Sequence, residues 1–205
     1  MEKIQYISQG ATLLQHRNNI IGVLEAGGKW IQLRCKCVDK DELLLFAIDI
    51  RLICDQYDAV FIINDYVDIA VAADADGVHL GLLDADVTEA RKILGYNRII
   101  GGTANNIDDV MNNIKDGCDY IGLGPLHYSE TKKNLSPILG IDGVRDVMAQ
   151  LKLQSLKKKP IYVIGGVVEK DIRDLCEVGV YGVALSSSLT LSPESFIYFN
   201  QLITS

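Results

Sequence analysis

Short runs rich in valine and isoleucine alternate along this chain with longer stretches of helical period, and the alternation occurs eight times. The segments between the short runs carry apolar residues at i, i+3 and i+4, which suits helices that bury one face. This alternation is typical of repeated βα units around a parallel sheet. The expected strands are residues 4–8, 30–34, 59–64, 77–80, 98–101, 120–124, 160–164 and 182–185.

Eight βα units in 205 residues leave about 25 residues per unit, close to the lower size limit of a (β/α)8 barrel. We therefore predict an α/β fold, a single (β/α)8 TIM barrel that occupies residues 1–205 as one domain. A doubly wound open sheet is the alternative, because the same βα pattern produces both folds. Gly27, Gly117 and Gly179 each follow an expected helix at the offset of a C-cap, which supports these boundaries.

The charge and the apolar pattern exclude several classes of partner. The formal net charge of −7 disfavours nucleic acid and anionic membrane surfaces. No apolar run approaches the ~18 residues that a membrane span needs. The first residues lack the pattern of a secretory signal, so we expect a cytoplasmic protein that acts on small molecules.

The five cysteines do not form a disulfide framework. Their number is odd, their spacing is not that of a zinc motif, and we expect reduced thiols. Cys35 and Cys37 are expected on one face of a strand, but nothing nearby in the sequence supplies two further soft ligands. We therefore assign both to packing and expect no metal-thiolate site.

Polar residues follow several of the expected strands. The C-terminal ends of the strands form the working face of such a barrel. Period two places Gln32, Arg34 and Lys36 on one side of the second strand, with Leu33 and Cys35 on the other. Two cations and an amide are thus expected to converge at this end of the barrel.

Two carboxylates follow the next two strands. Asp65 and Asp84 are hard oxygen ligands suited to Mg²⁺, which would share its other positions with phosphate oxygens and water. Arg34, Lys36 and Lys132 would balance the remaining charge of a metal-bound polyphosphate. Either aspartate alone would more often be a helix N-cap, but the two together at consecutive strand ends favour function.

A second phosphate position is expected after the last two strands. Gly165 and Gly166 follow the seventh strand, and Ser186 and Ser187 follow the eighth. Barrels of this type present backbone N–H groups to a phosphate monoester at this place. A tight turn at the glycines and helix capping by the serines are the alternative interpretations.

An ordered series of short motifs runs from Trp30 to Leu189. The motifs are Gln-Leu-Arg-x-Lys at 32–36, Ile-Ile-Asn-Asp at 62–65, Gly-Val-His-Leu-Gly-x-x-Asp at 77–84, Tyr-Ile-Gly-Leu-Gly-Pro at 120–125, Glu-Thr-Lys-Lys at 130–133 and Ile-Gly-Gly at 164–166. Each motif is weak alone, but in this order they resemble the thiamine phosphate synthase (thiamine-phosphate pyrophosphorylase) family.

The resemblance implies a transferase that joins 4-amino-5-hydroxymethyl-2-methylpyrimidine diphosphate to thiazole phosphate, giving thiamine phosphate and diphosphate. In the family the diphosphate leaves first, and the thiazole nitrogen captures the pyrimidine cation. The resemblance implies that Gln32 and Asn64 bind the diphosphate and that Thr103 lies near the pyrimidine. The residues implied for the thiazole phosphate are Ser129, Thr131, Gly166, Ser186 and Ser187.

Two other functions stay open from the sequence. A thiazole tautomerase-like enzyme of the same fold uses a histidine just after the sixth strand, where this chain has Gly124 and Pro125, with His127 following. A non-catalytic phosphate-binding barrel would need only the glycine and serine end of the site. We expect His79 to be a hydrogen-bonded core histidine. Homo-oligomer formation is compatible with the sequence and is not decided by it.

Overall fold

The computed structural model describes residues 1–128, 137–154 and 159–204. Within these residues, eight strands are hydrogen-bonded in sequence order and close into a barrel, because β1 also pairs with β8. All the neighbouring strands are parallel. The strands are β1 (Ile4–Ile7), β2 (Trp30–Leu33), β3 (Val60–Asn64), β4 (Gly77–Leu80), β5 (Ile99–Ala104), β6 (Tyr120–Leu123), β7 (Ile161–Val163) and β8 (Gly182–Leu185). The predicted (β/α)8 barrel is confirmed, and the open-sheet alternative is wrong.

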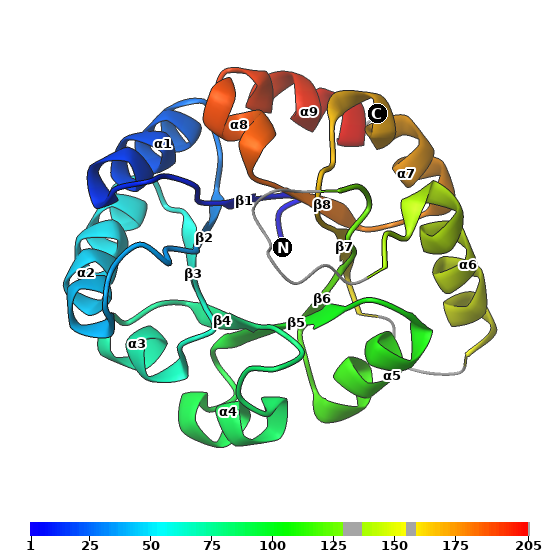
Figure 1. Ribbon diagram of the computed structural model, residues 1–205, viewed down its shortest axis with the longest axis horizontal. Coiled ribbons are helices and arrows are strands. Elements are labelled where there is room, and N and C mark those ends of the chain that lie inside the picture. The colour runs from blue at the N-terminus through cyan, green and yellow to red at the C-terminus, as the bar shows by residue number, and fades with distance from the viewer. Residues whose placement is uncertain (129–136, 155–158, 205) are drawn as a thin grey trace.

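Helices surround the barrel on the outside (Figure 1). They are α1 (Leu13–Glu25), α2 (Lys40–Gln56), α3 (Val67–Ala72), α4 (Val87–Leu94), α5 (Ile107–Asp116), α6 (Gly140–Leu153), the 3₁₀ turn η1 (Glu169–Asp171), α7 (Ile172–Val178), α8 (Ser187–Leu191) and α9 (Ser195–Thr204). Gly117 and Gly179 end α5 and α7 in the left-handed conformation, as the sequence predicts. None of these described helices combines the length and apolar composition that a bilayer span requires.

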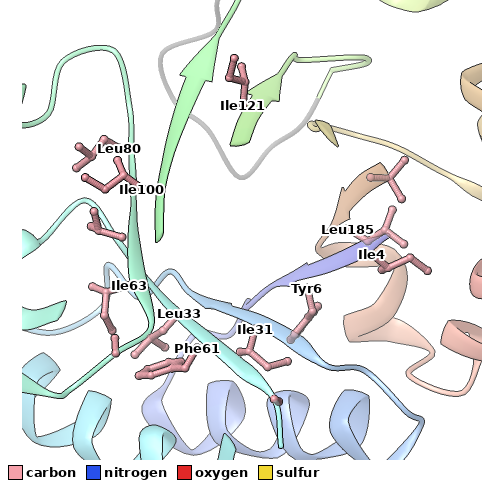
Figure 2. Close-up of a cluster of buried hydrophobic side chains, with 14 of the residues drawn as sticks. Ile4, Tyr6, Ile31, Leu33, Phe61, Ile63, Leu80, Ile100, Ile121 and Leu185 are labelled. Atoms are coloured by element: carbon pink, nitrogen blue, oxygen red, sulfur yellow. The ribbon is translucent and has the colours of Figure 1, made fainter. Parts of the chain in front are cut away.

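The main hydrophobic core lies between the strands and the helices. Alternate residues of each strand face outward, so Ile31 and Leu33 of β2 and Phe61 and Ile63 of β3 belong to one buried cluster. Figure 2 shows these side chains on neighbouring strands. Cys35 continues the outward series after β2 and is also part of this cluster.

The barrel interior is filled by a second cluster, made of Trp30, Ile62, Tyr120 and Tyr162. The Trp30 ring contacts the two tyrosine rings edge to face, with both centroids 5.0 Å away. Tyr120 needs a glycine on β5, since a Cβ added to Gly101 would lie 2.1 Å from the tyrosine ring. Aromatic side chains therefore close the interior.

A chain of hydrogen bonds links this aromatic cluster to side chains nearer the C-terminal ends of the strands. Gln32 Nε2 donates to Gln5 Oε1 (3.0 Å), and Gln5 Nε2 donates to the Tyr120 hydroxyl (3.1 Å). His79 joins Nδ1 to that hydroxyl and Nε2 to Thr103 Oγ1, both at 3.0 Å. His79 is thus the hydrogen-bonded core histidine that the sequence predicts.

The N-terminal ends of two strands carry a repeated ion-pair arrangement. Asp119, just before β6, accepts hydrogen bonds at Oδ2 from the backbone N–H of Ile100 (2.9 Å) and from Arg91 of α4 (2.6 Å). Asp76, just before β4, makes the same two kinds of bond, with the backbone of β3 and with Arg51 of α2. Each aspartate therefore ties two strands and a helix at the end of the barrel away from the predicted site.

Candidate active site

The predicted site residues of the first half of the chain lie at the C-terminal ends of β2 to β5. Arg34 follows β2 directly, Asn64 is the last residue of β3, and Thr103 lies near the end of β5. Asp65 follows β3, and Asp84 lies in the loop between β4 and α4. The barrel topology thus brings residues that are far apart in sequence to the face where barrels of this type carry their chemistry.

Lys36 and Asp65 form an ion pair at this face. The Nζ of Lys36 lies 3.4 Å from Oδ2 of Asp65, and the lysine side chain is 61% exposed while the aspartate side chain is 17% exposed. The Asp65 backbone is left-handed, with φ of 69°, and its N–H donates to the carbonyl of His79 at 2.8 Å. The left-handed φ, uncommon for a residue other than glycine, occurs directly after β3 ends at Asn64.

Asp84 lies close enough to Asp65 to affect the ionisation of Asp65. Burial, followed by the neighbouring carboxyl group of Asp84, raises the pKa of Asp65 to about 6, and Lys36 opposes this shift. Asp84 is held in turn by the N–H of Gly81, which donates to its Oδ2 at 2.6 Å. The loop after β4 therefore presents a carboxylate directly to the one that follows β3.

The two aspartates are not helix N-caps. The N-cap of α3 is Tyr66, the residue after Asp65, and the N-cap of α4 is Asp86, two residues after Asp84. The structural alternative considered for these two residues is therefore wrong, which leaves their carboxylates available for a ligand.

The carboxylate pair fits a divalent metal ion. Burial and the nearby charge of Asp84 both disfavour the ionised form of Asp65, which raises its pKa, and a bound cation would compensate both effects. Mg²⁺ prefers carboxylate oxygens and completes its shell with waters and substrate phosphates. Asp65 and Asp84 are thus the residues that would hold Mg²⁺, with Lys36 beside them.

Gln32 and Thr103 lie deeper in the barrel than Asp65 and Asp84. Gln32 is 1% exposed and its amide donates to Gln5, while Thr103 is 5% exposed and its hydroxyl bonds to His79. Thr103 and Asp84 line the same surface pocket. The roles of Gln32 and Thr103 in substrate binding stay predictions.

Arg34 is fixed through its backbone. Its N–H donates to the hydroxyl of Ser8, which follows β1, at 3.0 Å. This bond links the end of β2 to the end of β1. It therefore fixes the position of the backbone from which the segment carrying Arg34 and Lys36 begins. Gln32, Arg34 and Lys36 follow the predicted alternation, because Leu33 and Cys35 are buried in the outer core.

The predicted phosphate-binding glycines adopt conformations that favour glycine. Gly165 and Gly166 have φ of 83° and 71°. The loop after β6 packs on them: the N–H of His127 donates to the Gly165 carbonyl at 2.9 Å, and a Cβ added to Gly166 would lie 2.9 Å from Cβ of His127. A side chain at Gly166 would therefore displace this loop.

The serines after β8 are arranged differently from one another. The hydroxyl of Ser186 donates to Gln9 Oε1 at 3.2 Å, and Ser187 is exposed at the start of α8. The neighbouring Ser188 donates to the carbonyl of Val167 at 3.1 Å. The segments that follow β7, β8 and β1 are thereby joined at the same end of the barrel.

A histidine–aspartate pair at this end was not predicted. Nε2 of His127 lies 3.0 and 3.1 Å from the two carboxylate oxygens of Asp171, which is 5% exposed. Asp171 also accepts a hydrogen bond from the N–H of Val168 at 2.9 Å. The partners are 44 residues apart, so no local pattern could have paired them. The pair fixes the loop after β6 to the segment after β7.

Three predicted site residues lie outside the described residues. They are Ser129, Thr131 and Lys132. Their roles therefore stay predictions, based on the motif that the sequence carries after β6.

The assignment of Cys37 to packing is wrong, although that of Cys35 is confirmed. Cys35 is 5% exposed and belongs to the core, whereas Cys37 is exposed, because β2 ends at Leu33 and the chain has left the barrel wall. The buried His16 lies next to both cysteines. The absence of soft ligands close in sequence therefore did not mean their absence in space.

Comparisons with known proteins identify the family to which the chain belongs. A sequence model of the family described as thiamine monophosphate synthase matches residues 6–189. A thiamine-phosphate synthase from Flavobacterium johnsoniae is 46% identical over 98% of this chain and 94% of its own length. Another from Phocaeicola vulgatus is 43% identical over 91% of this chain and 89% of its own. A solved structure of thiamine phosphate pyrophosphorylase from Pyrococcus furiosus superposes with a TM-score of 0.83 at 26% identity, covering 99% of this chain and 97% of that one. The chain therefore belongs to the thiamine monophosphate synthase family and is a transferase of thiamine biosynthesis.

Proposed function

We propose that this enzyme joins 4-amino-5-hydroxymethyl-2-methylpyrimidine diphosphate to thiazole phosphate, with release of diphosphate and formation of thiamine phosphate. The observation that carries the proposal is the cluster of Lys36, Asp65 and Asp84 at the C-terminal face of the barrel. A cation and two carboxylates at one place suit a metal-bound diphosphate, whose charge requires both metal and basic residues. The names of the two bacterial relatives support the same activity.

The reaction asks the protein mainly to stabilise the leaving group. The bond between the pyrimidine methylene carbon and the diphosphate oxygen breaks, and its electron pair leaves with the diphosphate. The resulting cation is captured by the lone pair of the thiazole nitrogen, which forms the new carbon–nitrogen bond. No proton has to be removed from the carbon, so positively charged groups and proximity supply the catalysis.

The basic residues would meet the departing diphosphate from two sides. Arg34 and Lys36 follow β2, and Lys132 belongs to the loop after β6. Asn64, the last residue of β3, would add a neutral donor, and Gln32 another from within the barrel. Mg²⁺ held by Asp65 and Asp84 would neutralise charge on the leaving oxygens.

The pyrimidine would lie over the interior of the barrel. Thr103 is the last member of the hydrogen-bond chain that begins at Gln32. Its hydroxyl is oriented by His79, which is itself held by Tyr120. This chain supports a fixed donor or acceptor position for the polar edge of a pyrimidine.

The thiazole phosphate would lie at the opposite side of the same face. Gly166, Ser186 and Ser187 follow β7 and β8, where barrels of this fold hold phosphate monoesters with backbone N–H groups. Ser129 and Thr131 would add hydroxyl groups from the loop after β6. His127, bound to Asp171, would position that loop.

The two rival functions are not favoured. A thiazole tautomerase-like enzyme would not need the cluster of Lys36, Asp65 and Asp84, and Gly124 and Pro125 occupy the place of its histidine after β6. A non-catalytic phosphate-binding barrel would have no use for a pair of carboxylates whose repulsion is costly.

The test is diphosphate release by purified protein with both substrates and Mg²⁺. We expect Asp84→Asn to reduce turnover to near background without unfolding the protein, since it removes a metal ligand from an exposed loop. Asp86→Asn is the matched control, because asparagine keeps the N-cap of α4 and the change in charge is the same. Full activity of Asp84→Asn, or unchanged product formation in excess chelator, would contradict the proposed metal role.

A further inference from the structure

Outside the proposed active centre, three side chains with soft or borderline ligand atoms gather at one point. They are His16, Cys35 and Cys37, and one ligand atom of each lies within 4.8 Å of the other two. The two sulfur atoms are 3.1 Å apart. His16 and Cys35 are buried, while Cys37 is exposed, so the cluster has one side open to solvent.

The fold holds these residues together through the ends of two strands. His16 lies in the first turn of α1, and the cysteines lie in the segment between β2 and α2. Ser8, after β1, connects the two: its hydroxyl bonds to Nδ1 of His16 and accepts the N–H of Arg34, both at 3.0 Å. The proximity of the three ligands is thus a built feature of the barrel end.

We propose that His16, Cys35 and Cys37 form a binding site for a thiophilic cation, Zn²⁺. Two thiolates and one imidazole are a donor set that zinc takes in proteins, and a site with three protein ligands leaves a fourth position for water or another ligand. Hard cations such as Mg²⁺ do not compete well for sulfur. The inference is independent of the proposed reaction.

Only small movements are needed for this site to hold zinc. Zn–S bonds of ~2.3 Å at a tetrahedral angle separate two sulfur atoms by roughly 3.7 Å, somewhat more than their present distance. Rotation of the exposed Cys37 can supply the difference, because its side chain is not packed in the core. The imidazole must be neutral to bind, and burial lowers the pKa of His16, which favours that form.

Zinc binding at this site must be coupled to the loss of protons from the thiols. Burial raises the pKa of Cys35 to about 11, so in the absence of metal this residue is a protonated and weakly nucleophilic thiol. Zinc binding must therefore release protons and become stronger as the pH rises.

The two cation sites of the chain would be separated by chemistry. Arg34 and Lys36 alternate with Cys35 and Cys37 along the same segment. The basic residues therefore belong to the site with the two carboxylates, and the cysteines belong to the proposed zinc site. Asp65 and Asp84 offer hard oxygen atoms, and His16 with the cysteines offers nitrogen and sulfur. Mg²⁺ would therefore bind the oxygen atoms and Zn²⁺ the nitrogen and sulfur atoms.

The test is zinc binding by the full, reduced chain in the presence of excess Mg²⁺. We expect one equivalent of Zn²⁺ in competition with a chromophoric chelator, and sulfur-to-metal charge-transfer absorption when Co²⁺ replaces zinc. Cys37→Ser should weaken zinc binding by more than the ~10-fold typical of losing an outer-sphere partner, and should remove the absorption. His16→Asn should weaken binding as well.

The controls distinguish this site from the carboxylate pair. Cys176→Ser changes an exposed cysteine of α7 and should leave zinc binding unchanged. Asp84→Asn should also leave it unchanged. Equal zinc affinity in wild type and folded Cys37→Ser, or loss of zinc binding in Asp84→Asn, would overturn the proposal. Circular dichroism of each variant checks folding, and we expect Cys37→Ser to leave the core intact because Cys37 is exposed.

Discussion

Asp84 lies close enough to Asp65, which follows the neighbouring strand of the barrel, to disfavour ionisation of the Asp65 carboxyl group. The pKa of Asp65 is raised to about 6, first by burial and then by Asp84. Without a bound cation Asp65 therefore keeps its proton at a higher pH than an ordinary aspartate. A metal ion must displace that proton before it can bind.

The first prediction is that Mg²⁺ binding weakens as the pH falls through about 6, because the proton that Asp65 takes up competes with the metal. An ordinary aspartate would show this loss only near pH ~4. Titration of Mg²⁺ by calorimetry between these pH values measures the effect. Constant affinity down to pH ~4.5 would show that Asp65 is not protonated in this range.

The same pKa predicts how stability depends on pH in the absence of metal. The pKa of Asp65 is about 6 in the folded state and ordinary in the unfolded state, so the folded state binds more protons between these values. The free energy of unfolding must then fall as the pH rises from ~4 to ~6, and the full loss of stability is present above that window. Asp84→Asn removes the neighbouring charge and should reduce this slope, while Asp86→Asn should not. Urea unfolding at several pH values compares the three proteins.

Lys36→Met should affect substrate binding much more than folding. The lysine lowers the pKa of Asp65, so its removal should raise that pKa further and shift the pH dependence of Mg²⁺ binding upward. We expect the KM for the pyrimidine diphosphate to rise about 10-fold, as for loss of one charge-assisted bond worth ~1.5 kcal/mol. Because Lys36 is exposed, stability should change by less than ~0.5 kcal/mol. Steady-state kinetics and urea unfolding measure the two effects separately.

Tyr120→Phe tests the hydrogen-bond chain inside the barrel. The Tyr120 hydroxyl joins Gln5 to His79, and its loss leaves buried polar atoms without their partner. We expect a loss of ~1–3 kcal/mol in the free energy of unfolding. Tyr96→Phe is the control, because that tyrosine is 93% exposed. Equal stability of the two variants would mean that the chain rearranges without cost.

The fold could be predicted from the sequence because each barrel strand is a short run of apolar residues between two segments of helical period. Alternation within β2 correctly separates Gln32 from Leu33, and seven of the eight expected strands match the observed ones to within one residue at each end. The exception is β5, which continues to Ala104 beyond the expected Gly101. Glycine and threonine here form regular ladder pairs with β6, such as Gly102 with Ile121. The pairing strand, rather than local propensity, extends β5.

The proximity of the candidate site residues could be predicted only where a strand end identifies them. Asp65 and Asp84 lie near each other, as the sequence predicts, because each follows a strand and the barrel makes strand ends neighbours. The bond of His127 to Asp171 and the approach of His16 to Cys35 depend on how loops and helices pack, which no spacing along the chain encodes.

The last prediction concerns the opposite end of the barrel, where Asp119 accepts bonds from Arg91 and from the N–H of Ile100. Asp119→Ala would leave both donors without this partner. The Arg91 side chain is 13% exposed and that of Asp119 is 34% exposed, so water compensates only part of the loss. We therefore expect the free energy of unfolding to fall by ~1–3 kcal/mol.

Asp142→Ala is the matched control for Asp119→Ala. Asp142 is paired with Arg145 on α6, but its side chain is 93% exposed, and we expect a change within ~0.5 kcal/mol. Both variants should keep the kcat and KM of the wild type below their melting temperatures, because Asp119 precedes β6 whereas the proposed chemistry lies beyond the other ends of the strands. A fall in kcat for fully folded Asp119→Ala would contradict this expectation. It would show that a change at the N-terminal ends of the strands affects the chemistry at their C-terminal ends.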